Sequence, residues 1–245
     1  MQVNTQKKFY QSHIFENYPH IVHGYSTKAL GDMRNTGKRA AYARMLGLSS
    51  DSLVMAQQVH SDTVHTVDQL SKDPIPDTDG MVLPLKGRDN SGVALGIVVA
   101  DCAPLLFFDR KERSIGAAHA GWKGSYKGIA TNIINRMVSL GSKPEDILVS
   151  IGPRIGACCY SVPEDRAAAF LSAYDNDDRV ASLKAGTWYL DIGYVNWLQL
   201  RNAGIPAENI DVSLSCTSCE YEAFYSYRKD SKETFGEIMG VIGFI

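Results

Sequence analysis

Two histidines and one cysteine lie in or at the ends of expected strands, and their side chains could together hold a metal ion. Cys102 interrupts the apolar stretch VVADCAPLLFFD (98–109), which otherwise has the pattern of a buried core strand, while His119 and His60 lie in GAAHAGWKG and QQVHSDTV. Thiolate sulfur and imidazole nitrogen are common zinc ligands, and three protein ligands leave a fourth position for water or substrate. The spacing alone also leaves a packing role for Cys102 open.

The carboxylate beside this cysteine points to chemistry more strongly than the cysteine itself. A buried carboxylate is costly unless it is paired, so Asp101 is the nearest candidate for a catalytic group that moves protons. In HAGWKG a strand is expected to become a helix, whose free N–H groups could bind an anion. A metal-free alternative makes Cys102 a nucleophile and His119 its base in amide hydrolysis.

The elements that must position these residues follow a mixed pattern. Hydrophobic periodicity and β-branched runs predict strands at 20–28, 53–68, 93–100, 104–109, 114–120, 146–153, 187–191, 209–215, 223–228 and 237–245. Helices are predicted at 35–48, at 124–140, after Pro163 and at 192–204, and a surface loop at 71–80. Strands that occur both in runs and between helices favour an α/β (α+β) fold. We expect a layered sandwich of mixed β-sheets flanked by helices, with residues 1–245 as a single domain.

Composition excludes several classes of partner. The net charge is -2, so bulk electrostatics favours neither nucleic acid nor a membrane surface. The N-terminal residues lack the apolar core of a signal peptide, and no apolar run approaches the roughly 20 residues of a membrane span. Five cysteines, an odd number, are then expected to be reduced thiols in a cytoplasmic compartment. Phosphate-binding P-loop and Gly-rich dinucleotide patterns are missing.

The other four cysteines form two close pairs in the sequence. Cys158 and Cys159 are adjacent, and Cys216 and Cys219 make a CxxC motif, which can hold zinc or cycle between thiol and disulfide. A second zinc site with four thiolates is one possibility. Free thiols in a loop are the alternative.

Six motifs, taken together and in order, identify a family. They are QQVHSDTV, DTDGMV, VVADCAPLLFFD, AAHAGWKG, SIGPRIGACCYSV and FYSYRKD. From about residue 20 to the C-terminus the chain closely resembles the YfiH-type family, also called laccase-domain or polyphenol oxidoreductase proteins and now viewed as purine nucleoside phosphorylases. The resemblance implies a zinc ion bound by His60, Cys102 and His119. It also implies phosphorolysis of adenosine, inosine, guanosine and methylthioadenosine, with hydrolytic deamination of adenosine.

The expected substrates, purine nucleosides and phosphate, require groups that bind an anion. Lys28, Arg154 and Arg228 are the predicted substrate-binding residues, with Arg34 and Lys123 as further candidates. The chain departs from the family pattern in GYSTKALGDMRNTGKRAAY, where Lys28 replaces the usual Arg and a Gly pair is missing.

Besides the metal-free amide hydrolysis, two other functions remain open at the level of sequence. Copper-dependent polyphenol oxidation is one, because two histidines and a cysteine also suit copper, although six histidines in all make a four-copper site difficult. The other is a non-enzymatic, zinc-stabilised binding module in cell-wall precursor quality control, a role suggested for some bacterial relatives. The sequence leaves the oligomeric state open.

Overall fold

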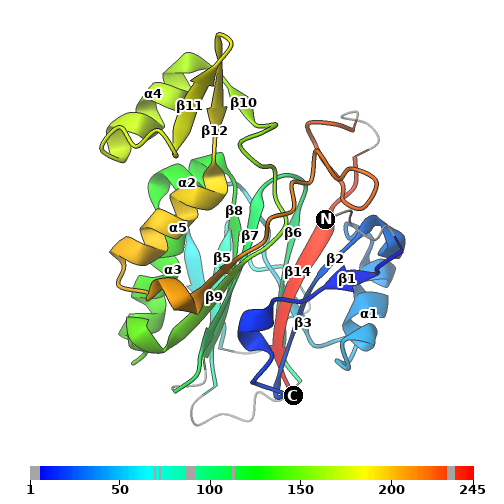
Figure 1. Ribbon diagram of the computed structural model, residues 1–245. Coiled ribbons are helices and arrows are strands. Elements are labelled where there is room, and N and C mark those ends of the chain that lie inside the picture. Colours follow the sequence, from blue (N-terminus) through cyan, green and yellow to red (C-terminus); the bar gives the residue numbers. More distant parts are fainter. Residues whose placement is uncertain (1–5, 69, 72, 86–91, 112–113, 231–234) are drawn as a thin grey trace.

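Two facing β-sheets with helices on both outer sides form the body of the protein (Figure 1). The computed structural model describes residues 6–68, 70–71, 73–85, 92–111, 114–230 and 235–245. The first sheet has the order β1-β2-β14-β6-β3, with bounds Phe9–Tyr10, Ile21–Ser26, Ile238–Phe244, Ala94–Val99 and Leu53–Met55. The second has the order β13-β9-β7-β8-β5-β4, with bounds Ile210–Val212, Ile147–Ile151, Ala103–Asp109, Ser114–Ala120, Gly80–Pro84 and Val64–Thr66. Both sheets mix parallel and antiparallel pairs.

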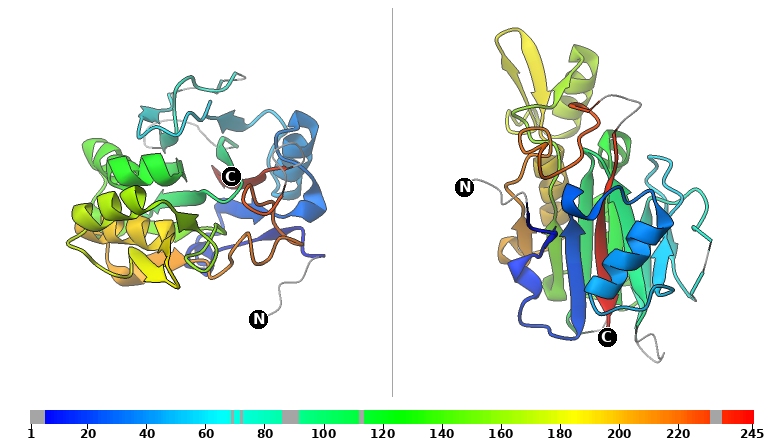
Figure 2. Two further views of the ribbon diagram at one scale, coloured as in Figure 1. Left: turned by 90° about the horizontal axis from the view of Figure 1, so that it is seen from above. Right: turned by 90° about the vertical axis from the view of Figure 1, so that its right-hand side faces the viewer.

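The helices and a small third sheet complete the fold. The helices are α1 (Thr36–Met45), α2 (Trp122–Lys127), α3 (Ile129–Ser139), α4 (Glu164–Ala173) and α5 (Ile192–Asn202). Single 3₁₀ turns cover His13–Phe15, Lys28–Leu30, Pro144–Asp146 and Ala207–Asn209. The third sheet has the order β10-β12-β11, with bounds Ser161–Val162, Thr187–Leu190 and Ala181–Lys184, and it projects with α4 from one end of the sandwich (Figure 2).

Strand alternation explains why β7 is apolar on both faces. Successive side chains of a strand point to opposite faces of the sheet. Leu106 and Phe108 accordingly lie in the core between the two sheets, whereas Leu105 and Phe107 pack on the other side with α3. A separate apolar cluster lies between α1 and the first sheet. This layered mixed α+β architecture confirms the predicted fold class; that residues 1–245 form one domain stays a prediction.

The chain crosses from the first sheet to the second at two places that matter for the site. Residues 56–63 connect β3 to β4, and residues 100–102 connect β6 to β7. The prediction that 53–68 is one strand was therefore wrong, because its middle leaves one sheet to reach the other. Cys102 lies in the turn between β6 and β7, as the predicted strands 93–100 and 104–109 leave it, and Asp101 has a positive φ of 79° there.

Two other expected elements also differ. The helix predicted at 124–140 is broken into α2 and α3 at Gly128, whose φ of 91° is left-handed and ends a helix. The strand predicted at 223–228 is a series of turns, because the N–H groups of Ala223 and Phe224 both bond to the Glu220 carbonyl. Within the described ranges, a membrane-spanning helix is not found: the longest helices, α3 and α5, have 11 residues each.

Candidate functional site

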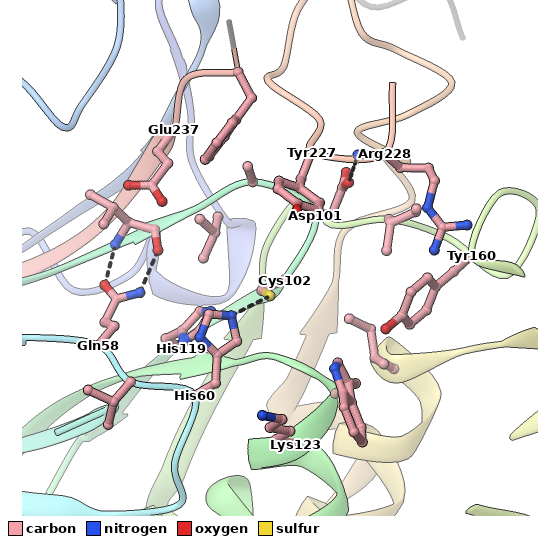
Figure 3. Close-up of a pocket in the computed structure, with 18 of the residues that line it drawn as sticks. Gln58, His60, Asp101, Cys102, His119, Lys123, Tyr160, Tyr227, Arg228 and Glu237 are labelled. Atoms are coloured by element: carbon pink, nitrogen blue, oxygen red, sulfur yellow. Dashed lines mark hydrogen bonds between the residues drawn. The ribbon is translucent and has the colours of Figure 1, made fainter. Parts of the chain in front are cut away.

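A cavity of about 750 Å³ lies where the loops between the two sheets meet (Figure 3). Its wall includes the three candidate ligands His60, Cys102 and His119. Small-molecule sites usually occupy roughly 300–1,000 Å³, so the cavity can hold a nucleoside-sized compound. In the view of Figure 3, Glu237 lies on one side of Cys102, and Tyr160 and Arg228 lie on the other.

The structure brings the three predicted ligands together from three separate segments. Their ligand atoms all lie within 4.8 Å of one another, and His60 Nε2 is 4.0 Å from Cys102 Sγ. Zinc held tetrahedrally, about 2.3 Å from sulfur and about 2.0 Å from nitrogen, separates those two ligand atoms by about 3.5 Å. The donor set and its spacing therefore fit a zinc ion with little movement.

Asp79 holds two of these ligands in place, and the sequence analysis missed it. Its Oδ1 is 2.7 Å from His119 Nδ1 and accepts the His60 N–H at 3.0 Å. Its Oδ2 accepts the N–H groups of Val59 and Ser61 and the Ser61 hydroxyl. A carboxylate on Nδ1 leaves Nε2 of His119 free for a metal, the usual arrangement around metal-binding histidines.

The same carboxylate explains the unusual backbone of His60. Its φ of 61° is uncommon for a residue with a side chain. Such a conformation persists where several surrounding hydrogen bonds fix the backbone. The three consecutive N–H groups of residues 59–61 all bond to Asp79, which is completely buried. The motif DTDGMV was the available signal, but an Asp beside a Gly is more typical of a turn.

Protonation at the site favours a thiolate beside a positively charged histidine when no metal is bound. Burial opposes ionisation of Cys102, but the charge and hydrogen bond of His119 outweigh it and lower the thiol pKa to about 7. Burial also opposes the charged form of His119, yet Cys102 and Asp79 raise its pKa to about 10. For Asp79, burial is outweighed by the bonds from His119 and Ser61, which lower its pKa to about 2.

Gly121 keeps space open behind the ligands. A Cβ at this position would lie 2.9 Å from His60 Cδ2 and 3.0 Å from Cys102 Sγ. Gly124 has the same role one turn later, where a Cβ would lie 2.7 Å from the Ser61 carbonyl oxygen. The two glycines of HAGWKG therefore let α2 start directly against the ligand cluster.

Both carboxylate oxygens of Asp101 already have partners. Oδ1 accepts the Thr217 hydroxyl at 2.6 Å, and Oδ2 accepts the Arg228 N–H at 2.7 Å. Burial raises the pKa of Asp101, although these bonds oppose the shift. Asp101 lines the cavity, but its contacts tie two loops of the wall together. Its role in proton transfer stays a prediction.

Arg228 is the one member of the predicted substrate-binding trio whose side chain lines the described part of the cavity. Its guanidinium bonds to the hydroxyl and the carbonyl of Ser161 and lies 5.5 Å from the Tyr160 ring. Lys123 also lines the cavity, as does Arg166, which stacks 4.0 Å from the Trp122 ring centroid. The sequence analysis missed Arg166, because one arginine on a helix surface carries no distinguishing signal.

Lys28 and Arg154 lie outside the cavity wall. Lys28 forms an ion pair with Asp230 at 3.5 Å and lies over the Tyr225 ring. Arg154 is 9% exposed and donates to the Ser213 carbonyl. Its contact with α5 is so close that a Cβ on Gly193 would overlap the guanidinium. The structure therefore gives both residues packing partners instead of a place beside the candidate ligands.

Two further groups shape the opposite side of the cavity. Glu237 lines it just before β14, and burial raises the pKa of this carboxyl while the charge of Arg34 opposes the shift. The Gln58 side chain pairs with the backbone of Val98 through both of its polar atoms, at 2.7 and 2.8 Å. Gln58 therefore fastens the His60 loop to the edge of β6.

Comparisons with known proteins identify the family of this chain. A family model described as multi-copper polyphenol oxidoreductase laccase matches residues 30–245. A Bacillus subtilis (strain 168) protein described as purine nucleoside phosphorylase YlmD is 32% identical over 256 residues, covering 93% of this chain and 90% of the relative. Adenosine deaminase RL5, from an unknown prokaryotic organism, is 31% identical and covers 80% of this chain and 77% of the relative.

A solved structure shares the fold over nearly the whole length. The crystal structure of the Bacillus licheniformis hypothetical protein YfiH superimposes with a TM-score of 0.84 at 31% identity, covering 94% of this chain and 95% of that one. Together with the family match and the order of the motifs, this shows that the chain belongs to the YfiH-type family of polyphenol oxidoreductase (laccase) proteins.

Proposed function

We propose that this chain is a zinc-dependent purine nucleoside phosphorylase that also deaminates adenosine. The observation that carries the proposal is one cavity in which a His–Cys–His cluster lies between basic side chains and the half-buried Glu237 carboxyl group. The relative named as a purine nucleoside phosphorylase covers nearly the whole chain. Adenosine, inosine, guanosine and methylthioadenosine are the proposed substrates, with phosphate as the second reactant.

His60, Cys102 and His119 would hold the zinc ion. When bound, zinc supplies Lewis-acid charge beside the substrate. Asp79 fixes the His119 ring so that Nε2 faces the cluster, and its bonds to the 59–61 backbone fix His60. Gly121 keeps side-chain atoms out of the space that the three ligands share.

Phosphorolysis forms a bond from a phosphate oxygen to the ribose carbon while the bond from that carbon to the purine nitrogen breaks. The cavity must therefore hold a dianion and stabilise the leaving base. Lys123, Arg166 and Arg228 are the basic side chains on its described wall, and we assign them to phosphate. We assign Glu237, whose pKa is raised by burial, to hold a proton for the purine.

The positions of the other histidines favour zinc over copper. Within the described residues, His13, His20, His23 and His65 belong to neither group of potential metal ligands. His23, for example, bonds to the Ser12 backbone. A multicopper oxidase needs several histidine-rich sites, so phenol oxidation is the weaker candidate despite the description of the family model.

The test is chromatography of adenosine incubated with purified protein, with and without phosphate, beside Cys102→Ala. Adenine that requires phosphate and disappears in the variant supports phosphorylase activity at this site. Inosine that forms without phosphate supports the deaminase, which one relative's name favours. If folded, zinc-loaded protein converts no nucleoside, both activities are refuted and the binding module is favoured. If the protein oxidises phenols only with copper, the oxidase is favoured.

A further inference from the structure

The four cysteines outside the cavity meet in one cluster. Cys158, Cys159, Cys216 and Cys219 each offer a sulfur, and all four sulfurs lie within 4.8 Å of one another. Cys219 Sγ is 3.5 Å from Cys158 Sγ and 3.3 Å from Cys159 Sγ. The two pairs, about 60 residues apart in sequence, come from the turn after β9 and from the segment after β13.

The spacing suits one tetrahedral metal ion. With sulfur about 2.3 Å from zinc, a tetrahedral site separates its sulfurs by about 3.8 Å, close to the distances found. A disulfide would explain the cluster less well than a metal ion. It would join only two of the four sulfurs and leave two thiols packed against it, because Cys219 could pair with only one of its two neighbours. Four converging thiols and no histidine or carboxylate form a donor set that selects a soft tetrahedral ion such as zinc.

The surroundings can stabilise the negative charge of such a site. Four thiolates around a divalent ion carry a net charge of -2. The Gly156 N–H donates to Cys216 Sγ at 3.2 Å, the kind of backbone bond that tunes metal-bound sulfur. Arg154, whose backbone bridges to Cys216, is a buried cation. Its guanidinium lies 4.0 Å from Asp191, and its Nε has no hydrogen-bond partner among the described residues.

We propose that Cys158, Cys159, Cys216 and Cys219 bind a second, structural zinc ion that joins the 154–160 turn to the 216–220 segment. Both joined segments support the cavity wall. Ile155 and Tyr160 line it directly, and Thr217 bonds to Asp101 at 2.6 Å. The ion would therefore fix the wall opposite Glu237 without touching the substrate.

The test measures metal content in a background that lacks the first site. Cys102→Ala protein, purified under reductant, loaded with zinc and desalted, should retain about one zinc ion per chain, and unmutated protein about two. Adding Cys219→Ser to Cys102→Ala should remove the remaining ion. Adding Ser218→Ala, inside the CxxC loop but without a ligand atom, should leave it bound.

Cobalt provides a readout that depends on the ligands themselves. Cobalt-loaded Cys102→Ala should show thiolate-to-metal charge transfer, although the variant has no thiol at the first site. If circular dichroism shows that Cys219→Ser does not fold, Cys158→Ser replaces it in the test, because the Cys158 side chain is exposed. Cys102→Ala protein that binds neither metal while its four thiols titrate freely overturns the proposal, and so does a disulfide within the cluster under reducing conditions.

Discussion

Replacing Asp79 with Asn tests whether one buried carboxylate organises the candidate metal site. The change keeps the size of the side chain but turns one acceptor oxygen into an NH₂ donor. In one orientation the new donor faces the His60 N–H and His119 Nδ1; in the other it faces the Val59 and Ser61 N–H groups and the Ser61 hydroxyl. At least two hydrogen bonds are therefore lost in either case.

The magnitude follows from these bonds. Hydrogen bonds to a charged group contribute about 1.5–3 kcal/mol each, so losing two lowers the free energy of unfolding by at least about 3 kcal/mol. Loss of the carboxylate that orients a ligating histidine usually lowers metal affinity 10–100-fold. We therefore expect both a lower denaturation midpoint and a zinc affinity about 10–100-fold weaker.

Two assays separate these effects. Denaturant unfolding of metal-free protein measures stability, and competition with a chromogenic chelator measures zinc affinity. Ser61→Ala is the matched control, because it leaves the carboxylate in place and removes only the Ser61 hydroxyl, which donates to Asp79 and accepts the Thr63 N–H. It should lower the free energy of unfolding by about 1.5–3 kcal/mol and leave the zinc affinity nearly unchanged. If Asp79→Asn matches Ser61→Ala in both assays, Asp79 does not have the organising role described above.

Three further predictions test neighbouring parts of the site. Gly121→Ala should displace the His60 and Cys102 side chains and weaken zinc binding in the chelator assay, with an unchanged circular dichroism spectrum; unaltered affinity would contradict the close packing. In metal-free protein, iodoacetamide should alkylate Cys102 with a rate that rises with pH and is half-maximal near pH 7, since the thiolate reacts and its pKa is lowered to about 7. A midpoint near 9 would show that His119 does not stabilise the thiolate. Arg166→Ala should raise the KM for phosphate several-fold and leave the KM for nucleoside nearly unchanged; equal changes in both would argue against a phosphate subsite there.

The strand pattern predicted part of the site, because strand neighbours follow from sequence. Strands β7 and β8 pair with Pro104 opposite His119, so a cysteine just before β7 must lie near a histidine at the end of β8. His60 could be associated with them only by family resemblance. Its segment looks like a continuous strand, and its left-handed backbone depends on contacts with Asp79, which is distant in sequence.

Residues that act through tertiary contacts were harder to predict than those in motifs. Lys28 and Arg154 were predicted from their charge alone. In the structure Lys28 pairs with Asp230 and Arg154 packs against α5, so a binding role for either residue stays a prediction. Glu237 and Arg166 have ordinary local sequences and become notable only because they face the same cavity. Charge identifies candidates, but burial and partners decide which of them reach the site.

The two crossings between the sheets have a consequence for how the protein matures. His60 and Cys102 lie on crossings from the first sheet to the second, and His119 ends a strand of the second. Contacts between residues so distant in the chain form slowly, after loop closure has been overcome. A chain in which β4, β5, β7 and β8 have not yet paired therefore has no complete ligand set. The rate of metal capture by refolding protein would then report how fast the second sheet forms.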